Sequence, residues 1–347
     1  VPLINKGDLI AQAQSGTGKT GAFSIGTLER MDFSKKSLQA LILSPTRELT
    51  TQTYNVIKSI GKDLAENNTN FCQSFVGGTR VQDDINKIKN GSIVAVGTPG
   101  RILDVLKRGA FNTESMKIIV LDEADEMLSQ GFQEQIYEIF RFMPKDIQVC
   151  LFSATMPKEV LELAEMFMRK PTKILVRQES LTLDGIKQYY DSTDEESKNE
   201  ILCDLYGSIS EAQSVIFVNT RRKVDYLCEI LNKSEFPVAP LHSELPKGDR
   251  EEIMDKFRNG HFRVLVTTDL VARGIDVHHV NIVINYDLPT NMENYIHRIG
   301  RSGRFGRKGV AINFVTHRDT QMLQEIEQHY HTEVQEMPLN FASHLEQ

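Results

Sequence analysis

The sequence predicts an α/β protein with two tandem domains, each a mostly parallel sheet flanked by helices. Short β-branched runs alternate with helix-length amphipathic stretches, which is typical of parallel strands joined by helices that cover both faces of a sheet. The chain has 347 residues, too many for one ordinary core and suitable for two. The alternation also breaks once, in a polar stretch near residues 177–184, and then resumes.

The first series holds seven strand-like runs, each a short apolar segment bounded by turn residues. Amphipathic periodicity between them predicts helices, including those over Arg47–Glu66 and Phe132–Phe142. We assign residues 1–177 to a first domain, with strands expected at Leu9–Ala13, Ala40–Leu43, Asn70–Phe75, Ile93–Val96, Ile118–Leu121, Val149–Phe152 and Lys173–Val176.

A second series of the same kind follows a linker at residues 178–184. We assign residues 185–347 to this second domain and interpret the acidic run Asp191–Glu200 as a solvated loop and helix start. Its strands are expected at Lys187–Asp191, Val215–Val218, Val238–Leu241, Val264–Val266, Ile282–Asn285 and Val310–Phe314.

The composition is that of a soluble globular protein, with 40% hydrophobic and 25% charged residues. No apolar run has the length of a membrane span and no signal peptide opens the chain, so we expect no membrane partner. The negative net charge of −7 comes from the second half, so any nucleic-acid groove must be local. Four cysteines stand singly in apolar contexts, which favours buried reduced thiols in a cytoplasmic or nuclear protein. Because the chain begins at Val1 rather than methionine, we expect it to be a fragment.

A glycine-rich turn before a helix predicts a nucleotide-phosphate site that uses ATP and Mg²⁺. Lys19 should reach the β- and γ-phosphates, and the Thr20 hydroxyl should ligate Mg²⁺. Gly16 and Gly18 let the backbone N–H groups approach the phosphates without a Cβ in the way. Taken alone, such a turn is often only a tight turn. The whole ATP-binding segment is Ala13, Gln14, Ser15, Gly16, Thr17, Gly18, Lys19 and Thr20.

Acidic residues at the end of an apolar strand supply the second half of this site. Asp122 should bind ATP-bound Mg²⁺, directly or through water, and Glu123 is placed to orient and deprotonate the attacking water. For Glu123 the alternative is a carboxylate at a helix start, favoured by the helix dipole. The two halves together favour nucleotide hydrolysis.

The strand Val149–Phe152 is followed by Ser153, Ala154 and Thr155. With Pro157 just beyond, the two hydroxyls are compatible with a helix N-cap. Beside a phosphate site, they are equally compatible with a link between nucleotide state and domain closure. The sequence leaves both interpretations open.

Arginines separated by glycines lie in the second half of the chain. Arg301 and Arg304 indicate a pair delivered to the γ-phosphate from the opposite domain, each worth about 10³–10⁵-fold in turnover. The alternative is a solvated basic loop. Asp276, with Gly274 in the same segment, is placed to bind the ribose of ATP.

The order of these motifs resembles that of DEAD-box RNA helicases over essentially the whole chain. The resemblance implies two RecA-like domains, with ATP and RNA bound across the cleft between them. It also implies RNA-stimulated hydrolysis of ATP and unwinding of short duplexes. The motifs that carry it are Ala13–Thr20, Pro45–Leu49, Gly77–Gly78, Thr98–Arg101, Asp122–Asp125, Ser153–Thr155, Thr267–Asp269, Ala272–Asp276 and His297–Arg304.

The same resemblance implies a set of RNA-binding residues. In the first domain these are Pro45, Thr46, Arg47, Gly78, Thr98, Pro99, Gly100 and Arg101. In the second they are Thr220, Arg221, Arg250, Thr267, Thr268, Asp269 and Arg273. His297 is implied to join Ser153, Ala154 and Thr155 in coupling RNA to nucleotide. Phosphate and sugar contacts carry no sequence information, so single-stranded RNA or a short duplex of any sequence should bind.

Within the family, Asn219–Asp225 and Gly309–Val315 are similar to the branch that works in translation initiation. That branch implies a cytoplasmic monomer whose partner is a HEAT-repeat scaffold protein. A nuclear branch that forms an ATP-dependent RNA clamp in mRNA processing shares every catalytic residue, so it stays open, as does a nuclear location. The remaining alternative, a small-molecule P-loop kinase, would not need a second domain bearing Arg301 and Arg304.

The chain departs from the family pattern in two places. The adenine-reading aromatic residue and glutamine would lie upstream of Val1. Where relatives often carry a glutamine three residues before Arg250, this chain has Lys247. The role of that glutamine is therefore not carried over.

Overall fold

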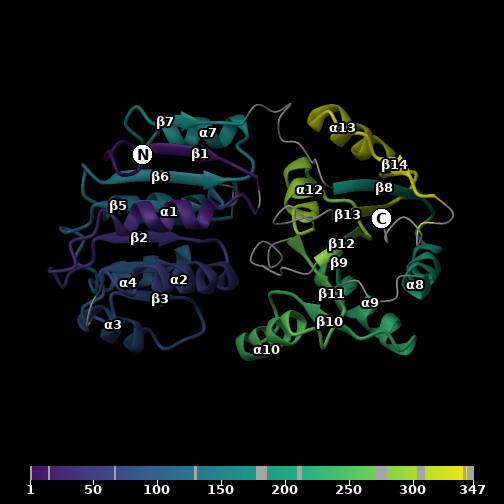
Figure 1. Ribbon diagram of the computed structural model, residues 1–347, viewed down its shortest axis with the longest axis horizontal. Coiled ribbons are helices and arrows are strands. Elements are labelled where there is room, and N and C mark those ends of the chain that lie inside the picture. The colour runs from purple at the N-terminus through teal and green to yellow at the C-terminus, as the bar shows by residue number, and fades with distance from the viewer. Residues whose placement is uncertain are drawn as a thin grey trace. The chain divides into compact units, whose positions relative to one another are not determined.

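The computed structural model describes residues 2–14, 16–65, 68–128, 131–176, 186–208, 213–269, 280–302, 309–338 and 341. The chain forms two compact units, Val1–Val176 and Arg177–Gln347 (Figure 1). The predicted linker at residues 178–184 lies outside the described residues. No helix in these described ranges is long and apolar enough to cross a membrane.

Unit 1 is built on a seven-stranded sheet whose recorded strand pairings are all parallel. The order across the sheet is β3-β4-β2-β5-β6-β1-β7. The strands are β1 (Leu9–Gln12), β2 (Ala40–Leu43), β3 (Cys72–Phe75), β4 (Val94–Gly97), β5 (Ile118–Asp122), β6 (Gln148–Ser153) and β7 (Thr172–Ile174).

Both faces of this sheet are covered, because side chains alternate between the faces along each strand. Leu41 and Leu43 pack with residues of α4, α5, α6 and α7. Ala40 and Ile42 pack on the other face with residues of α1 and α2. The helices are α1 (Lys19–Leu28), α2 (Arg47–Gly61), α3 (Val81–Lys89), α4 (Pro99–Lys107), α5 (Ala124–Met127), α6 (Gln133–Arg141) and α7 (Lys158–Glu165).

Unit 2 repeats this plan with a second seven-stranded parallel sheet, in the order β10-β11-β9-β12-β13-β8-β14. Ile216 packs on one face with α8 and α9, and Phe217 packs on the other with α10. The strands are β8 (Ile186–Ser192), β9 (Gln213–Phe217), β10 (Val238–Leu241), β11 (Val264–Thr267), β12 (Val280–Asn285), β13 (Gly309–Val315) and β14 (Gln335–Glu336). The helices are α8 (Lys198–Ser208), α9 (Arg221–Lys233), α10 (Lys247–Arg258), α12 (Met292–Ile299) and α13 (Thr320–Tyr330).

The predicted fold class is confirmed. Every predicted strand is present, with its ends within two residues of the expected positions. The helix expected over Arg47–Glu66 ends earlier, at Gly61, where a Cβ would lie 2.8 Å from the Phe71 ring. The acidic run begins inside β8, since that strand includes Asp191, as predicted, and continues one residue further to Ser192. Strand β14 was missed, since its two residues are exposed and carry no apolar pattern.

Candidate functional site

The predicted site residues of unit 1 follow the carboxyl ends of neighbouring parallel strands. Such ends share one edge of a sheet, which is where ligands bind in this class of fold. The order of the strands sorts the residues into two groups. Segments after β3, β4 and β2, which are adjacent, carry the predicted RNA-binding residues. Segments after β5, β6 and β1, also adjacent, carry the predicted nucleotide-binding residues.

The predicted phosphate-binding turn joins β1 to the start of α1. Its last residue before the helix, Gly18, has a left-handed backbone with φ 96°, and a Cβ added there would meet nothing within 4 Å. Among the described residues, no side-chain hydrogen bond caps the start of α1, and its first N–H groups are the backbone donors that would suit a phosphate. Lys19 Nζ donates to the backbone carbonyls of Ala13 at 2.7 Å and Gln14 at 3.1 Å. The lysine therefore already lies over the turn that would hold a phosphate.

The acidic segment begins where β5 ends. Asp122 is the last residue of that strand and is 3% exposed. Burial, reinforced by the neighbouring Glu123 carboxylate, raises the pKa of Asp122 to about 7. Glu123 has a left-handed backbone, φ 51° and ψ 57°, before the short helix α5. A non-glycine residue seldom adopts that conformation, and such strain is concentrated at functional sites.

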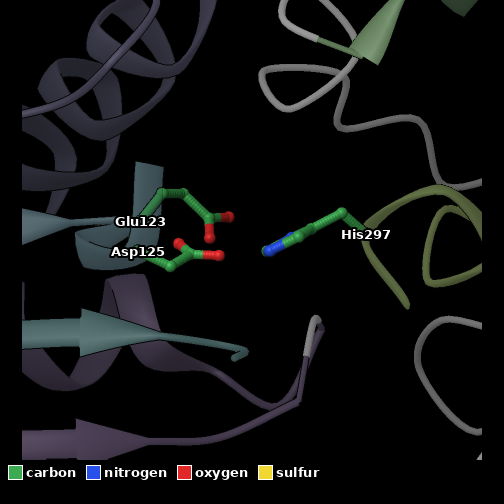
Figure 2. Close-up of side chains that lie close together, drawn as sticks. All are labelled: Glu123, Asp125 and His297. Atoms are coloured by element: carbon green, nitrogen blue, oxygen red, sulfur yellow. The ribbon is translucent and has the colours of Figure 1, made fainter. Parts of the chain in front are cut away.

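Asp125 connects the acidic segment to the end of β6. Figure 2 shows Glu123 and Asp125 projecting from the segment that follows β5, and it also labels His297 of α12. Asp125 accepts hydrogen bonds from Ser153 Oγ at 2.7 Å and from Thr155 Oγ1 at 2.5 Å. The N-cap interpretation of these hydroxyls is wrong, because α7 starts at Lys158 and its N-cap, Pro157, receives no side-chain bond. The hydroxyls instead tie the strand β6 to the acidic segment.

These residues fit a magnesium-bound nucleoside triphosphate. The space around Gly18, at the start of a helix, suits phosphate oxygens. A carboxylate whose pKa is raised by burial and by the neighbouring Glu123 carboxylate favours a divalent cation as its partner. Lys19, Thr20 and Asp122 are the residues that would hold the phosphates and the ion.

The predicted RNA-binding residues of unit 1 lie at two helix starts and a glycine turn. Thr46 is the N-cap of α2 and accepts a hydrogen bond from the Leu49 N–H at 3.2 Å. The Arg47 guanidinium lies against the turn after β3, where a Cβ on Gly78 would come within 3.2 Å of it. Thr98, Pro99 and Gly100 open helix α4, with Pro99 as its first residue. Pro45 lies in the segment between β2 and α2.

Arg101 is engaged inside the protein. Its guanidinium donates to Thr79 Oγ1 at 2.9 Å, to the Thr79 carbonyl at 2.8 Å and to Asp84 Oδ2. The Asp84 side chain is fully buried and also accepts from Lys87 at 3.0 Å. The structure thus gives Arg101 a bracing contact between α3, the glycine turn and α4.

The predicted RNA-binding residues of unit 2 that the structure describes follow β10, β11 and β9, which are adjacent in their sheet as β3, β4 and β2 are in unit 1. Thr220 is the N-cap of α9, and Arg221 pairs with Glu244 at 2.6 Å. Thr267 ends β11 and is buried, with Thr268 next in the chain. The side chain of Asp269 pairs with Arg298. Arg250, in α10, is buried.

Helix α12 follows β12 and carries the remaining described residues. It contains His297, and Arg301 lies just beyond its end, with its Nε donating to the His297 carbonyl at 2.9 Å. Ala154 is buried between the two hydroxyls of the β6 end. Five predicted site residues fall outside the described residues, namely Ser15, Arg273, Gly274, Asp276 and Arg304.

Three residues that contact the predicted site residues were given no role in the sequence analysis. Asp125, Asp84 and Arg298 each form buried ion-pair or hydrogen-bond contacts with predicted site residues. Asp125 lies within the acidic motif, so its position was a usable signal. Asp84 is an ordinary first-turn carboxylate of α3, and nothing in its local sequence distinguishes it.

Comparison with known families defines the class of protein. The family description "DEAD/DEAH box helicase" matches residues 1–163, and "Helicase conserved C-terminal domain" matches residues 197–306. Together they cover most of the chain. With the sequence Asp122-Glu123-Ala124-Asp125 at the end of β5, the chain belongs to the DEAD-box helicase family.

Within this family, the chain is similar to proteins named as initiation factor 4A. The chain is 68% identical to "Probable eukaryotic initiation factor 4A" of Trypanosoma cruzi, over 99% of this chain and 85% of the relative. It is 55% identical to "ATP-dependent RNA helicase eIF4A" of Mycosarcoma maydis, over 99% of this chain and 82% of the relative. The identity is spread over nearly the full length rather than confined to the motifs.

Solved structures agree in fold. The chain matches S. cerevisiae Dbp5 bound to RNA and ADP BeF3 with a TM-score of 0.89 and 39% identity, covering 98% of this chain and 87% of that one. It matches Mss116p bound to ssRNA and AMP-PNP with a TM-score of 0.86 and 30% identity, covering 95% and 70%. These neighbours identify the two units as the tandem RecA-like domains of DEAD-box helicases.

Proposed function

We propose that this chain is an ATP-dependent RNA helicase that unwinds short duplexes in translation initiation. The relatives named as initiation factor 4A favour that role over a nuclear clamp. One observation carries the biochemical part. In each sheet the predicted RNA-binding segments follow three adjacent strands, and in unit 1 the nucleotide-binding segments follow the next three. A bound RNA and a bound nucleotide can then occupy neighbouring parts of one sheet edge.

Residues 1–177 would act as the ATP-binding domain and residues 185–347 as the second helicase domain. Lys19 would hold the terminal phosphates, Thr20 and Asp122 would hold Mg²⁺, and Glu123 would orient and deprotonate the attacking water. Mg²⁺ supplies charge neutralisation at the phosphates when it is bound. Arg301 and Arg304 would stabilise the charge that develops on the terminal phosphate.

The RNA-binding segments would hold the backbone of a single strand. Thr46, Thr98 and Thr220 lie at helix starts, where N–H groups and hydroxyls suit phosphate oxygens. Ser153 and Thr155, bonded to Asp125, would pass a change at the nucleotide to the rest of the unit. Binding of ATP would favour the RNA-bound state, and loss of phosphate would release it.

The decisive experiment measures phosphate release with and without single-stranded RNA. Activity in the parent should depend on RNA and Mg²⁺. Glu123→Gln should lower kcat by about 10²–10⁴-fold while RNA and ATP still bind, because only the general base is lost. Glu114→Gln makes the same chemical change on an exposed residue before β5, at the opposite edge of the sheet, and should leave kcat unchanged. RNA release from Glu123→Gln as fast as from the parent in ATP would refute the mechanism.

The setting of this activity is also proposed. A translation role favours a cytoplasmic protein that acts as a monomer and binds a HEAT-repeat scaffold. A clamp would hold RNA in ATP without repeated hydrolysis. Multiple turnovers with RNA alone, followed by phosphate release, separate the helicase from the clamp.

A further inference from the structure

Arg298 is a buried guanidinium whose hydrogen-bonding capacity is fully used inside unit 2. Its side chain is 1% exposed. Nη1 donates to the Asp287 carbonyl at 2.6 Å and to Asn285 Oδ1 at 3.3 Å. Nη2 donates to Asn219 Oδ1 and to Asp269 Oδ2, both at 2.8 Å, and Nε donates to Asp269 Oδ1. An arginine has five N–H donors, so none remains for a ligand.

The partners of Arg298 come from the ends of three neighbouring strands. Asn219 follows β9, Asp269 follows β11, and Asn285 is the last residue of β12. These strands are adjacent in the order β11-β9-β12. The guanidinium also lies 5.1 Å from the ring centroid of Phe217, the last residue of β9. One side chain of α12 therefore braces the edge where the RNA-binding segments of this unit begin.

The same helix leads directly to a predicted catalytic arginine. The Arg301 N–H donates to the Arg298 carbonyl at 3.1 Å, and the Arg301 Nε donates to the His297 carbonyl. On the other side of the brace, Asp269 is the residue after Thr268. A shift of Arg298 would consequently move both the Thr267–Thr268 segment and the start of the arginine segment.

We propose that Arg298 and Asp269 form a positioning pair: Asp269 does not bind RNA but holds the Thr267–Thr268 segment against α12. This rests on the proposed function of Thr267 and Thr268 as RNA contacts. It changes the role expected for Asp269, whose two carboxylate oxygens each accept a hydrogen bond from Arg298. The bidentate geometry is specific to arginine, because a planar guanidinium places two parallel N–H groups opposite the two carboxylate oxygens, whereas a lysine ammonium is a single point charge.

The test compares Asp269→Asn, Arg298→Lys and the double variant with the parent. Hydrogen exchange of the backbone amides of 264–269 reports the brace, and the KM for single-stranded RNA with kcat reports its effect on function. Each single variant should speed exchange and raise the KM by about 10–100-fold. The double variant should lie within about twofold of the worse single variant, because both substitutions break one contact.

Tyr206→Phe is the matched control in the same unit. Tyr206, in α8, is buried, and its hydroxyl shares a hydrogen bond of 2.5 Å with Ser214 Oγ near the amino end of β9, away from the braced carboxyl edge. It should lower the unfolding midpoint yet leave the KM for RNA and the exchange of 264–269 unchanged. If Arg298→Lys does not fold, Asp269→Asn decides alone, since Asp269 is 24% exposed and its replacement keeps the shape.

Two results would overturn the pairing. In one, exchange over 264–269 stays at the parent rate in both single variants. In the other, the KM effects of the two substitutions multiply in the double variant, as expected if Asp269 contacts RNA directly. A parent without RNA-stimulated activity would instead refute the proposed function, and the exchange rates would still decide whether Arg298 and Asp269 form the brace.

Discussion

Replacing Arg101 by methionine distinguishes a bracing residue from a ligand. The resemblance to the family makes Arg101 an RNA contact, whereas the structure engages its guanidinium with Thr79 and Asp84. The substitution removes three donors from a side chain that is 8% exposed. It leaves the fully buried Asp84 carboxylate with Lys87, at 3.0 Å, as its recorded ion-pair partner.

The expected cost follows from that burial. Breaking a buried pair by removing one partner costs about 3–5 kcal/mol, because the other charge stays buried. Since Lys87 remains, we expect the lower end, about 3 kcal/mol. With a denaturant slope of roughly 2–3 kcal/mol per molar urea, the midpoint of unit 1 should fall by about 1 M.

Urea unfolding of the full chain, followed by circular dichroism, measures this shift. Arg101→Met combined with Asp84→Leu should recover most of the loss, because replacing both buried partners by apolar groups is far less costly than replacing one. Binding of a fluorescent single-stranded RNA is measured in parallel. An unchanged midpoint with RNA affinity reduced tenfold or more would show that Arg101 is a direct ligand and that the reasoning is wrong.

Three further outcomes are expected. Gly97→Ala places a Cβ 2.5 Å from Ile102 Cγ1 and 2.9 Å from the Phe75 carbonyl oxygen, so thermal unfolding should show unit 1 destabilised by about 1–3 kcal/mol. The control is Gly207→Ala in α8, where a Cβ meets nothing within 4 Å and should not destabilise the protein. Burial raises the pKa of the Cys72 thiol, and it raises the pKa of Cys150 and Cys228 to about 12. At pH 8 an alkylating reagent should therefore label the half-buried Cys203 first. Equal labelling rates for all four thiols in the folded protein would contradict this. Thr155→Val removes one donor to Asp125 and should lower the number of duplexes separated per ATP hydrolysed, with a stability loss of about 1–3 kcal/mol measured by urea.

The sequence predicted the strands well because each is a short apolar run between polar turns. The sequence did not predict the order of the strands across each sheet. β1 lies between β6 and β7, and that placement depends on pairing between segments far apart in the chain. Within each unit, the described motifs follow the carboxyl ends of adjacent strands, because a parallel sheet aligns these ends along one edge.

The contacts between motifs were the part that the sequence could not supply. Arg101 and Asp84 are 17 residues apart, and Arg298 and Asp269 are 29 apart, so no local spacing links either pair. Ser153 and Thr155 show the same limit, since their hydroxyls turn back to Asp125 rather than forward to α7. Motif matching selected the candidate residues and left open which of them bind ligands and which hold others in place.

The position of the first strand in each sheet has a consequence for how the protein is made. Leu9–Gln12 pairs with β6 and β7, and Ile186–Ser192 pairs with β13 and β14. A ribosome must therefore synthesise most of a unit before its earliest strand finds a neighbour. Pairing between such distant segments is slow and leaves apolar strands exposed to association. We expect nascent chains that stop short of Gln148 to need chaperone protection, and each unit to close only as its final strands emerge.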